Sequence, residues 1–337
     1  MAKVKMAAVL VALSLFCAGV ALAEDWKVQE SNTIQGNVDA ATGSGNKVDI
    51  GSVKAGGASG VKSADIGANN QTKNITAKNG GKVAIGSANL TNASAGKVTQ
   101  QVINKVQGDV TSDKSDVSVG SLNAEGANVS GNITQQMTNQ TGKIDAKNST
   151  VNVGNTKIDG LKATSVTNKA SNTVGNITVD SSEVSVGSIN ASGAQIGNLT
   201  LQNQNNDAPN TVGNITATGG NSLVRIGSAN LDGAKVDGDV TVKSTSTLKD
   251  VTATNGGVVE VGSLSARGTT ADSIKLDSVN KVTDNISATQ GAKVAVGSAN
   301  LDGMKGGKVD MTTRNTVNGS IRANGNGTSV NVGSMSK

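Results

Sequence analysis

Three aspartates occupy equivalent points of a repeated pattern, where carboxylates could support acid–base or metal chemistry. Asp159, Asp232 and Asp302 each directly precede a glycine. Carboxylates at matching points of stacked repeats would suit an acid pair that cleaves polysaccharides or a row of calcium ligands. The equivalent positions in other repeats hold Gly56, Thr91, Glu125, Ser192 and Arg267. Because this position is so variable, we predict a solvated turn there, with no catalytic or metal-binding residue.

The residue types that other catalytic and cofactor sites need are scarce. The chain has no His and one Cys, Cys17, which excludes the common zinc and nucleophile–base arrangements. Its aromatic residues are Phe16 and Trp26, and one Trp cannot line a carbohydrate cleft. We therefore predict no enzyme and no cofactor. A carbohydrate-active β-helix enzyme remains the weakest alternative.

A set of threonines at one register suggests a different surface chemistry. Thr111, Thr178, Thr216 and Thr252 follow equivalent strand signals, and a flat threonine array can order water. The same register elsewhere holds Asp39, Asp145, Ser287 and Arg322. These interruptions argue against an ice-binding face.

The N-terminal residues have the layout of a secretory signal peptide. Lys3 and Lys5 precede an apolar run from Met6 to Val20, and Ala21-Leu22-Ala23 supplies small residues before Glu24. This pattern predicts a signal peptide over residues 1–23 that is cleaved after Ala23. A retained helical anchor is the alternative. We expect export by the general secretory pathway to the cell surface or exterior, with the periplasm left open.

Charge and composition exclude several other classes. The net charge is +5, and about +3 without the two lysines of the signal segment. The charges are interspersed, so we predict no nucleic-acid partner. No transmembrane segment is expected after cleavage, and the aromatic girdles of a membrane barrel are missing. The apolar residues are mainly Ala, Val, Ile and Leu, which predicts a thin core built from small side chains.

Nearly all of the remaining chain consists of one repeat. The pattern Val-x-(Ile/Val)-Gly-(Ser/Asn) occurs nine times at intervals of 33 to 40 residues. Its glycines are Gly51, Gly86, Gly120, Gly154, Gly187, Gly227, Gly262, Gly297 and Gly333. A period near 35 with short apolar–polar alternation predicts an all-β fold, a parallel β-helix or β-solenoid of about nine repeats over residues 24–337.

Three strand signals recur in each repeat. Val224 and Ile226 flank Arg225 in the motif itself, and this period of two is typical of a strand with one buried face. A second signal follows the motif glycine by about 12 residues, as in Gly131–Thr134. A third precedes the next glycine, as in Gly213–Thr216. We therefore expect at least three short strands per repeat, in one wide coil rather than two narrow coils of about 17 residues.

Corner residues and one loop complete the predicted coil. Six residues after the motif glycines stand Gly57, Asn92, Gly126, Gly160, Gly193, Gly233, Gly268 and Gly303. Glycine and asparagine adopt positive φ most readily, so we predict a left-handed corner at this register. The longest interval contains Asn203–Asn210 and the single proline, Pro209. Because proline cannot donate to a ladder, this segment is expected to bulge from one coil as a loop.

The repeats resemble those of two groups of exported bacterial proteins. Gly213–Gly220 and Gly227–Leu231 look like the repeats of filamentous-haemagglutinin-type adhesins. That resemblance implies a right-handed β-helix. The composition, rich in Gly, Asn, Gln, Ser, Ala and Val and poor in aromatics, is similar to that of curlin-like subunits of functional amyloid. It implies a self-assembling extracellular fibre or biofilm matrix.

These observations lead to an expected function. We expect an exported structural or adhesive protein that forms a fibre, matrix or surface component. The repeat array begins part-way through a repeat at Gly36-Asn37-Val38 and ends after the motif Val330–Ser334. This arrangement favours end-to-end self-association. The alternative is a binding module that presents the loop at Asn203–Asn210 to a partner such as a cell-surface or matrix polysaccharide.

Overall fold

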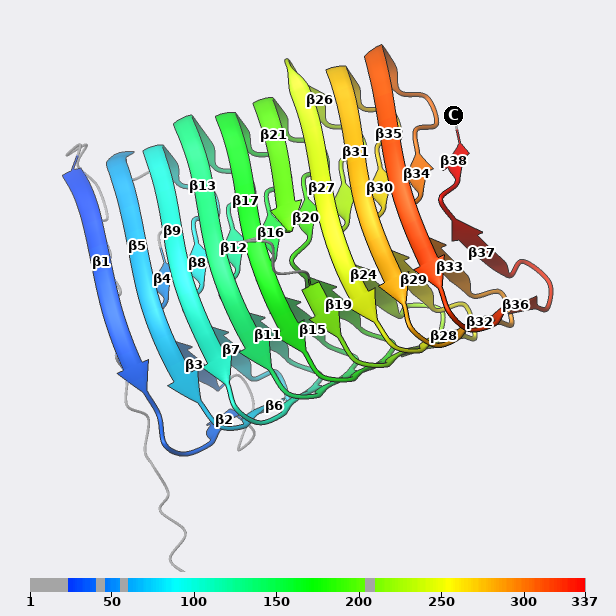
Figure 1. The fold of residues 1–337 in the computed structure, drawn as a ribbon. Helices are drawn as coiled ribbons and strands as arrows, with labels where there is room; N and C mark the ends of the chain where they lie inside the picture. Colours follow the sequence, from blue (N-terminus) through cyan, green and yellow to red (C-terminus); the bar gives the residue numbers. More distant parts are fainter. Residues whose placement is uncertain (1–23, 41–45, 55–59, 204–209, 337) are drawn as a thin grey trace, which may run out of the picture.

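The computed structural model describes residues 24–40, 46–54, 60–203 and 210–336. All regular elements in these residues are β-strands, and the paired strands run parallel. They stack into the β-solenoid expected from the repeat (Figure 1). The predicted signal segment 1–23, the corner at Gly57 and the interior of the predicted loop lie outside the described residues.

Each repeat forms one wide coil, which has four strands in most repeats. In the third coil these are β9 (Ser94–Val106), β10 (Val110–Asp113), β11 (Asp116–Val119) and β12 (Leu122–Asn123). Each strand pairs in register with its counterpart one repeat away, as Val117 does with Val151. The preference for a single wide coil is therefore confirmed. The expectation that all strands are short is wrong, because the first strand of most coils is long, and the two-residue fourth strand was not predicted.

The long strands form one broad sheet, the long-strand sheet, with eleven members. Besides β9 they are β1 (Glu24–Thr33), β5 (Gly60–Thr72), β13 (Asn128–Thr141), β17 (Lys162–Val174), β21 (Gln195–Asn203), β22 (Asn210–Val212), β26 (Lys235–Val236), β27 (Asp239–Leu248), β31 (Thr270–Val282) and β35 (Lys305–Val317). Two coils contribute two strands each, β21 with β22 and β26 with β27.

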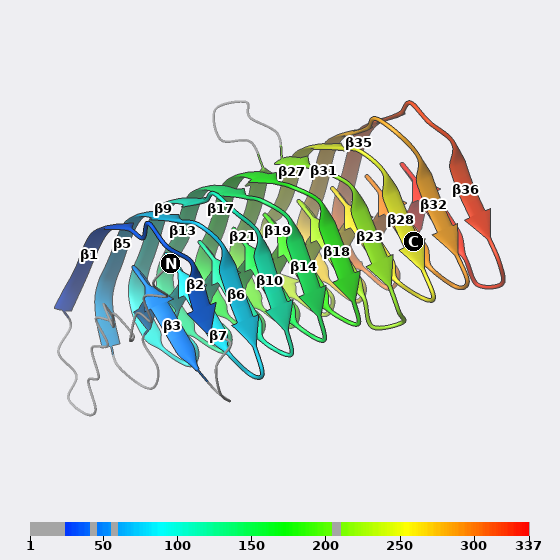
Figure 2. The ribbon, with the colours of Figure 1, turned by 90° about the horizontal axis from the view of Figure 1, so that it is seen from below.

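The second sheet follows the long strands around the coil (Figure 2). Besides β10 it contains β2 (Val38–Ala40), β6 (Ile75–Lys78), β14 (Ile144–Lys147), β18 (Ile177–Asp180), β23 (Ile215–Thr218), β28 (Val251–Thr254), β32 (Ile286–Thr289) and β36 (Ile321–Asn324).

The third sheet is built from the repeat motif itself. Besides β11 it contains β3 (Lys47–Ile50), β7 (Lys82–Ile85), β15 (Thr150–Val153), β19 (Glu183–Val186), β24 (Leu223–Ile226), β29 (Val258–Val261), β33 (Lys293–Val296) and β37 (Ser329–Val332). The nine copies of the motif thus correspond to nine stacked strands, which delimit about eight turns of the solenoid.

The fourth sheet consists of two-residue strands. Besides β12 it contains β4 (Val53–Lys54), β8 (Ala88–Asn89), β16 (Thr156–Lys157), β20 (Ile189–Asn190), β25 (Ala229–Asn230), β30 (Leu264–Ser265), β34 (Ala299–Asn300) and β38 (Met335–Ser336). From β8 to β34, each leads through a corner residue into the next long strand.

The predicted loop interrupts a long strand. β21 ends at Asn203 and β22 begins at Asn210. Both strands pair with β27, where Asn203 is opposite Ser244 and Asn210 is opposite Ser246. The extra residues of this coil are therefore inserted where the neighbouring strand has the single residue Thr245. The pairing on both sides of the insertion is maintained.

The apolar core consists of two large parallel columns, with a small cluster of Ala68, Val102, Met137 and Ala170 on the long strands between them. One contains Val106, Val110 and Val117, and lies between the C-terminal half of the long strands and the second and third sheets. The other contains Val98 and Leu122, and lies between the N-terminal half of the long strands and the fourth sheet. Both columns consist of small aliphatic side chains stacked on their counterparts from coil to coil, as the composition predicts.

The coils that are described in full turn at three left-handed corners. The predicted corner residues have positive φ wherever the structure describes them, from 54° at Asn92 to 69° at Gly233. The motif glycines are left-handed as well, with φ between 54° and 66°. A third corner joins the second and third sheets through residues such as Lys114 and Asn148. The sequence pattern identified one of these three corners.

The two glycine corners differ in the space around them. A Cβ atom at Gly233 would have no heavy atom within 4 Å. At Gly154 it would lie 2.6 Å from Oδ1 of Asn172 and 2.7 Å from Nδ2 of Asn139. Gly233 is therefore required only for its backbone conformation, whereas Gly154 is also required for a close approach to buried amides.

This difference predicts unequal effects of substitution. Gly233→Ala should lower the free energy of unfolding by about 1–2 kcal/mol, the cost of a left-handed alanine. Gly154→Ala should lower it by about 2–5 kcal/mol, because it also disrupts a buried hydrogen bond. Gly233→Asn should lower the free energy of unfolding less than Gly233→Ala does, since asparagine tolerates this conformation. Urea denaturation measures all three, and equal effects of the two alanine substitutions would contradict the distinction.

Candidate functional site

A ladder of buried amides runs through the interior between the two apolar columns. Its members occupy one register of the long-strand sheet: Asn32, Asn70, Asn104, Asn139, Asn172, Asn210, Ser246, Asn280 and Asn315. From Asn32 to Asn210 each Nδ2 donates to Oδ1 of the next coil over 2.8–3.0 Å. Asn280 donates to Asn315 in the same way over 2.9 Å. All these bonds have one direction along the solenoid axis.

The ladder lies against the motif glycines. The coil is narrow at the point where a motif glycine meets the ladder asparagines, and this narrow part is called the waist. At Gly120 a Cβ would lie 2.5 Å from Oδ1 of Asn139 and 2.6 Å from Nδ2 of Asn104. Glycine is therefore needed both for its left-handed backbone and for the close approach. The waist explains why the repeat motif keeps glycine in every copy and why the core is split into two columns.

The ladder is broken at Ser246, where serine replaces asparagine. Three atoms around the break are buried without a hydrogen-bond partner: Nδ2 of Asn210, Oγ of Ser246 and Oδ1 of Asn280. The shorter side chain leaves the amides of the neighbouring coils without the donor and acceptor that an asparagine would supply. This is the coil that follows the insertion at 204–209.

A smaller polar cluster extends from the waist into the second apolar column. Nε2 of Gln135 donates to Oε1 of Gln100 over 3.0 Å, and Nε2 of Gln100 donates to the Gly86 carbonyl over 2.9 Å. Nδ2 of Asn168 donates over 2.6 Å to the hydroxyl of Thr156, which occupies a register held by Ala or Leu in most coils. Amides do not titrate near neutral pH, so this cluster provides packing and hydrogen bonds but no acid or base.

Polar side chains at the corners also connect adjacent coils. Oδ1 of Asn74 accepts from the Asp109 N–H over 2.9 Å, and Oδ1 of Asp109 accepts from the Lys143 N–H over 2.9 Å. The hydroxyl of Ser87 similarly accepts from the Ser121 N–H over 3.2 Å. Oδ1 of Asn176, which follows Gly175, accepts from the Asn214 N–H over 3.0 Å. The recurrent Gly-Asn and Gly-Ser pairs of the sequence therefore help to satisfy the backbone at the corners.

The three aspartates considered for catalysis do not face one another. In the stack of coils Ser192 separates Asp159 from Asp232, and Arg267 separates Asp232 from Asp302. The described residues contain no group of three or more His, Cys, Asp and Glu that could hold a metal ion. Each of the three aspartates lies in a turn, as predicted.

Two of these aspartates bind the next coil in different electrostatic settings. Asp232 accepts from Nε and Nη2 of Arg267 over 3.0 and 2.6 Å and from the Ser265 hydroxyl over 2.7 Å. Burial opposes its ionisation, but these hydrogen bonds outweigh burial and lower its pKa. Asp159 accepts from the Ser192 N–H, and burial raises the pKa of this carboxyl.

The threonines of the predicted third strand form a single row on the second sheet. Thr178, Thr216 and Thr252 are in register, and Asp145 lies between Thr111 and Thr178. The sequence patterns did not reveal a longer row on the outer face of the long-strand sheet. That row is unbroken over five coils: Thr99, Thr134, Thr167, Thr200 and Thr241. The recurring Thr two residues after the glycine-asparagine pair could have indicated it.

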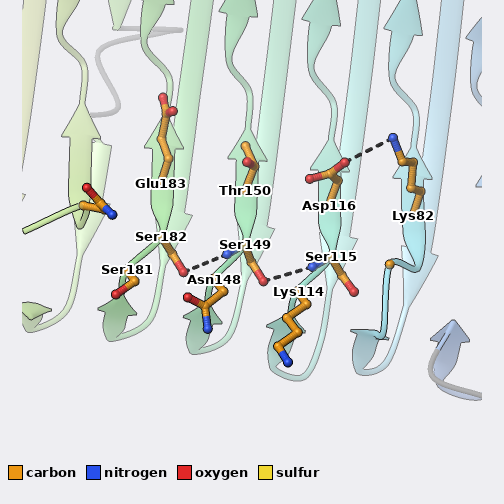
Figure 3. Close-up of a pocket in the computed structure, with 12 residues that line it drawn as sticks. Lys82, Lys114, Ser115, Asp116, Asn148, Ser149, Thr150, Ser181, Ser182 and Glu183 are labelled. Atoms are coloured by element: carbon orange, nitrogen blue, oxygen red, sulfur yellow. Dashed lines mark hydrogen bonds and ion pairs between the residues drawn. The ribbon is translucent and has the colours of Figure 1, made fainter. Parts of the chain in front are cut away.

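An open depression of about 480 Å³ follows the corner between the second and third sheets (Figure 3). In it the Ser115 N–H donates to Oγ of Ser149, and the Ser149 N–H donates to Oγ of Ser182. Lys82 and Asp116 form an ion pair of 3.3 Å at its edge. These hydroxyls hold the backbone of successive coils, and no nucleophile–base pair is formed among them.

The two ends of the described array have free strand edges. β1, β2, β3 and β4 each lie at one edge of their sheet, and β35, β36, β37 and β38 lie at the other. No described strand pairs with these outer edges. In the last coil, no described coil stacks on the apolar side chains that face the core. Ile321 and Met335 are therefore 50% and 57% exposed. A free edge beside exposed apolar residues is a typical site of strand addition.

Comparisons of the chain with models of known protein families, with curated proteins and with solved structures found no match. Among the described residues no helix is long and apolar enough to cross a membrane.

The break in the ladder predicts a stabilising substitution. Ser246→Asn should raise the free energy of unfolding by about 1–3 kcal/mol, because an amide there can accept from Asn210 and donate to Asn280. The reverse change, Asn139→Ser, should lower it by about the same amount. Chemical denaturation followed by circular dichroism measures both. A destabilised Ser246→Asn protein would contradict the explanation that the ladder is broken only because serine is too short.

The lowered pKa of Asp232 predicts a stability effect that depends on pH. A carboxyl with a lowered pKa stabilises the fold above its unfolded pKa of about 3.9, and this contribution is lost as the pH falls through the folded value. Asp232→Asn should therefore lower the denaturation midpoint at pH 7. The difference in midpoint between the variant and the wild type should become smaller as the pH is lowered. Asp302→Asn, at an exposed turn, is the control and should change little. An Asp232→Asn effect independent of pH would refute the electrostatic explanation.

Proposed function

We propose that the protein is an exported structural subunit that assembles end to end, with the last coil of one copy continuing into the first coil of the next. The observation that carries the proposal is the pair of free edges, four strands at each end of the described array. In a parallel solenoid the two ends differ and are complementary, because each coil already pairs with the next in one direction. Such a head-to-tail contact propagates without closing.

The amide ladder supports the same contact. At one end no described residue donates to Oδ1 of Asn32, and at the other Nδ2 of Asn315 donates to no described residue. A second copy in register would place the free donor of Asn315 beside the free acceptor of Asn32. The ladder would then continue through the interface with its direction unchanged.

Apolar burial at the interface would favour assembly. Ile321 and Met335 in the last coil are exposed, while Val330 and Val332 are partly buried against the core. In the preceding coil the equivalent residues Ile286 and Val294 are fully enclosed. Covering the last coil would extend both core columns, with a gain of about 25 cal/mol for each Å² of apolar surface buried.

Two other functions are weaker proposals. A binding module that presents the insertion at 204–209 would need a partner specific to that loop. A carbohydrate-active enzyme would need converging acids, and Asp159, Asp232 and Asp302 are separated in the stack. Export to the cell surface or exterior through the signal segment at 1–23 is part of the proposed function.

The assembly proposal is tested with a charge at the open end of the core. Ile321→Lys should abolish filaments seen by light scattering and electron microscopy, because a buried unpaired lysine would oppose the contact. The double change Val330→Lys/Val332→Lys should have the same effect. Val279→Lys is the matched control, since Val279 is an exposed apolar residue within the array. Assembly should persist in that variant.

The β-sheet circular dichroism spectrum must be unchanged in each variant, so that loss of filaments reports on the interface. Wild-type protein that stays monomeric at high concentration would refute the proposal. Undiminished filaments from Ile321→Lys would show that assembly uses another surface.

A further inference from the structure

Charge is distributed unequally around the solenoid. Strands β9, β13, β17 and β21 contain no Asp or Glu, and they carry Lys97, Lys105, Lys162 and Lys169. The described acids of the same coils lie elsewhere, at Asp109, Asp113, Asp116, Glu125, Asp145, Asp159, Asp180, Glu183 and Asp232, and Asp207 of the insertion lies outside the described residues. The middle of the long-strand sheet is therefore a basic face on a solenoid whose other faces carry more acids than bases in these coils.

The lysines of this basic face are exposed and form no ion pair with another described residue. The described ion pairs of lysine involve Lys47, Lys82, Lys143, Lys157 and Lys235. Lys97, Lys105 and Lys169 point outward from the sheet and are exposed. Two of them are eight residues apart on β9, which corresponds to roughly 27 Å along the strand. Lys169 is two strands away, roughly 10 Å across the sheet. An extended polyanion fits this spacing better than a small anion.

Neutral hydrogen-bonding groups fill the surface between the lysines. The row Thr99, Thr134, Thr167, Thr200 and Thr241 crosses the whole basic face. A parallel row two residues along the strands contains Gln101, Gln136, Lys169, Gln202 and Lys243. Hydroxyl and amide groups in fixed rows are suited to bind the hydroxyl groups of a sugar chain.

A depression of about 440 Å³ lies on the same face, beside the basic strands. Gly67, Gln101, Ile103 and Gln136 are among its lining residues, and Ile103 is 55% exposed. Glu30 also borders the depression, where its carboxylate accepts from Asn32. An exposed isoleucine among amides offers an apolar contact for the C–H face of a pyranose ring.

We propose that the basic face of the long-strand sheet binds an acidic polysaccharide. Other polyanions fit the surface less well. Single-stranded nucleic acid is usually held by stacking on aromatic side chains, and none of these strands contains an aromatic residue. A broad sheet cannot enter the major groove of a duplex as a helix or a two-stranded ribbon does. Assembly would repeat the face along a fibre, but binding by a single copy does not depend on assembly.

The test uses sodium alginate, a polyuronate, as the probe in affinity gel electrophoresis. Wild-type protein should be retarded by alginate and not by neutral dextran, and added salt should weaken the retardation. The triple variant Lys97→Gln/Lys105→Gln/Lys169→Gln should bind about tenfold or more weakly. The control variant Lys78→Gln/Lys114→Gln/Lys147→Gln removes equal charge from the second sheet and its corner. It should bind within about twofold of wild type.

Each remaining outcome would overturn the proposal. Equal weakening in both variants would show that net charge alone attracts the polymer. Undiminished binding of alginate by the first variant would show that the basic face is not the binding site. Equally tight binding of single-stranded DNA would show a general polyanion surface without selectivity for sugar. The assay is repeated in the Ile321→Lys background, so that failure of assembly is distinguishable from failure of polysaccharide binding.

Discussion

The contact between the motif glycine and the buried asparagine ladder is the constraint on which the rest of the solenoid depends. At Gly154 a single added carbon would lie within 2.7 Å of two ladder amides. The backbone can approach so closely only without a side chain, and each amide is satisfied chiefly by its counterparts in the next coils. The waist thus links the shape of one coil to the register of the next. A coil shifted by one residue would place the asparagines outside and break the ladder.

This constraint explains how a chain with almost no aromatic residues encloses a core. The waist divides the interior into two narrow columns, which Val, Ile, Ala and Leu can fill. The stacking of identical side chains repeats the same packing in every coil. Corner side chains such as Asn74 and Ser87 accept from the backbone of adjacent coils, where the strand ladders stop. Stability therefore comes from many small, repeated contacts between neighbouring coils.

Much of the fold could be predicted from the sequence because its signals are local and repeated. The period near 35, the alternation around Arg225 and the glycine or asparagine at the corners all predicted a wide parallel coil, and the structure confirms it. The length of the long strand was not predicted. Its inward positions hold polar residues such as Gln100 and Asn104 between the apolar ones, so the segment has the pattern of a polar sequence. The waist was missed because the asparagine and the glycine that meet there are distant in the chain. The residues at the corner of Asp159, Asp232 and Asp302 vary from coil to coil, so Arg267 lies between Asp232 and Asp302 in the stack.

The proposed function depends on the surfaces of the stack, where free strand edges lie at both ends of the described array. The most direct measurement is electron cryo-microscopy of material assembled from the purified protein. Continuation of the coil predicts filaments whose axis follows the solenoid axis. The strand spacing of about 4.8 Å should run without a break across the subunit boundary, with β35 beside β1 of the next copy. Filaments of subunits packed side by side, or monomers at every concentration, would contradict it.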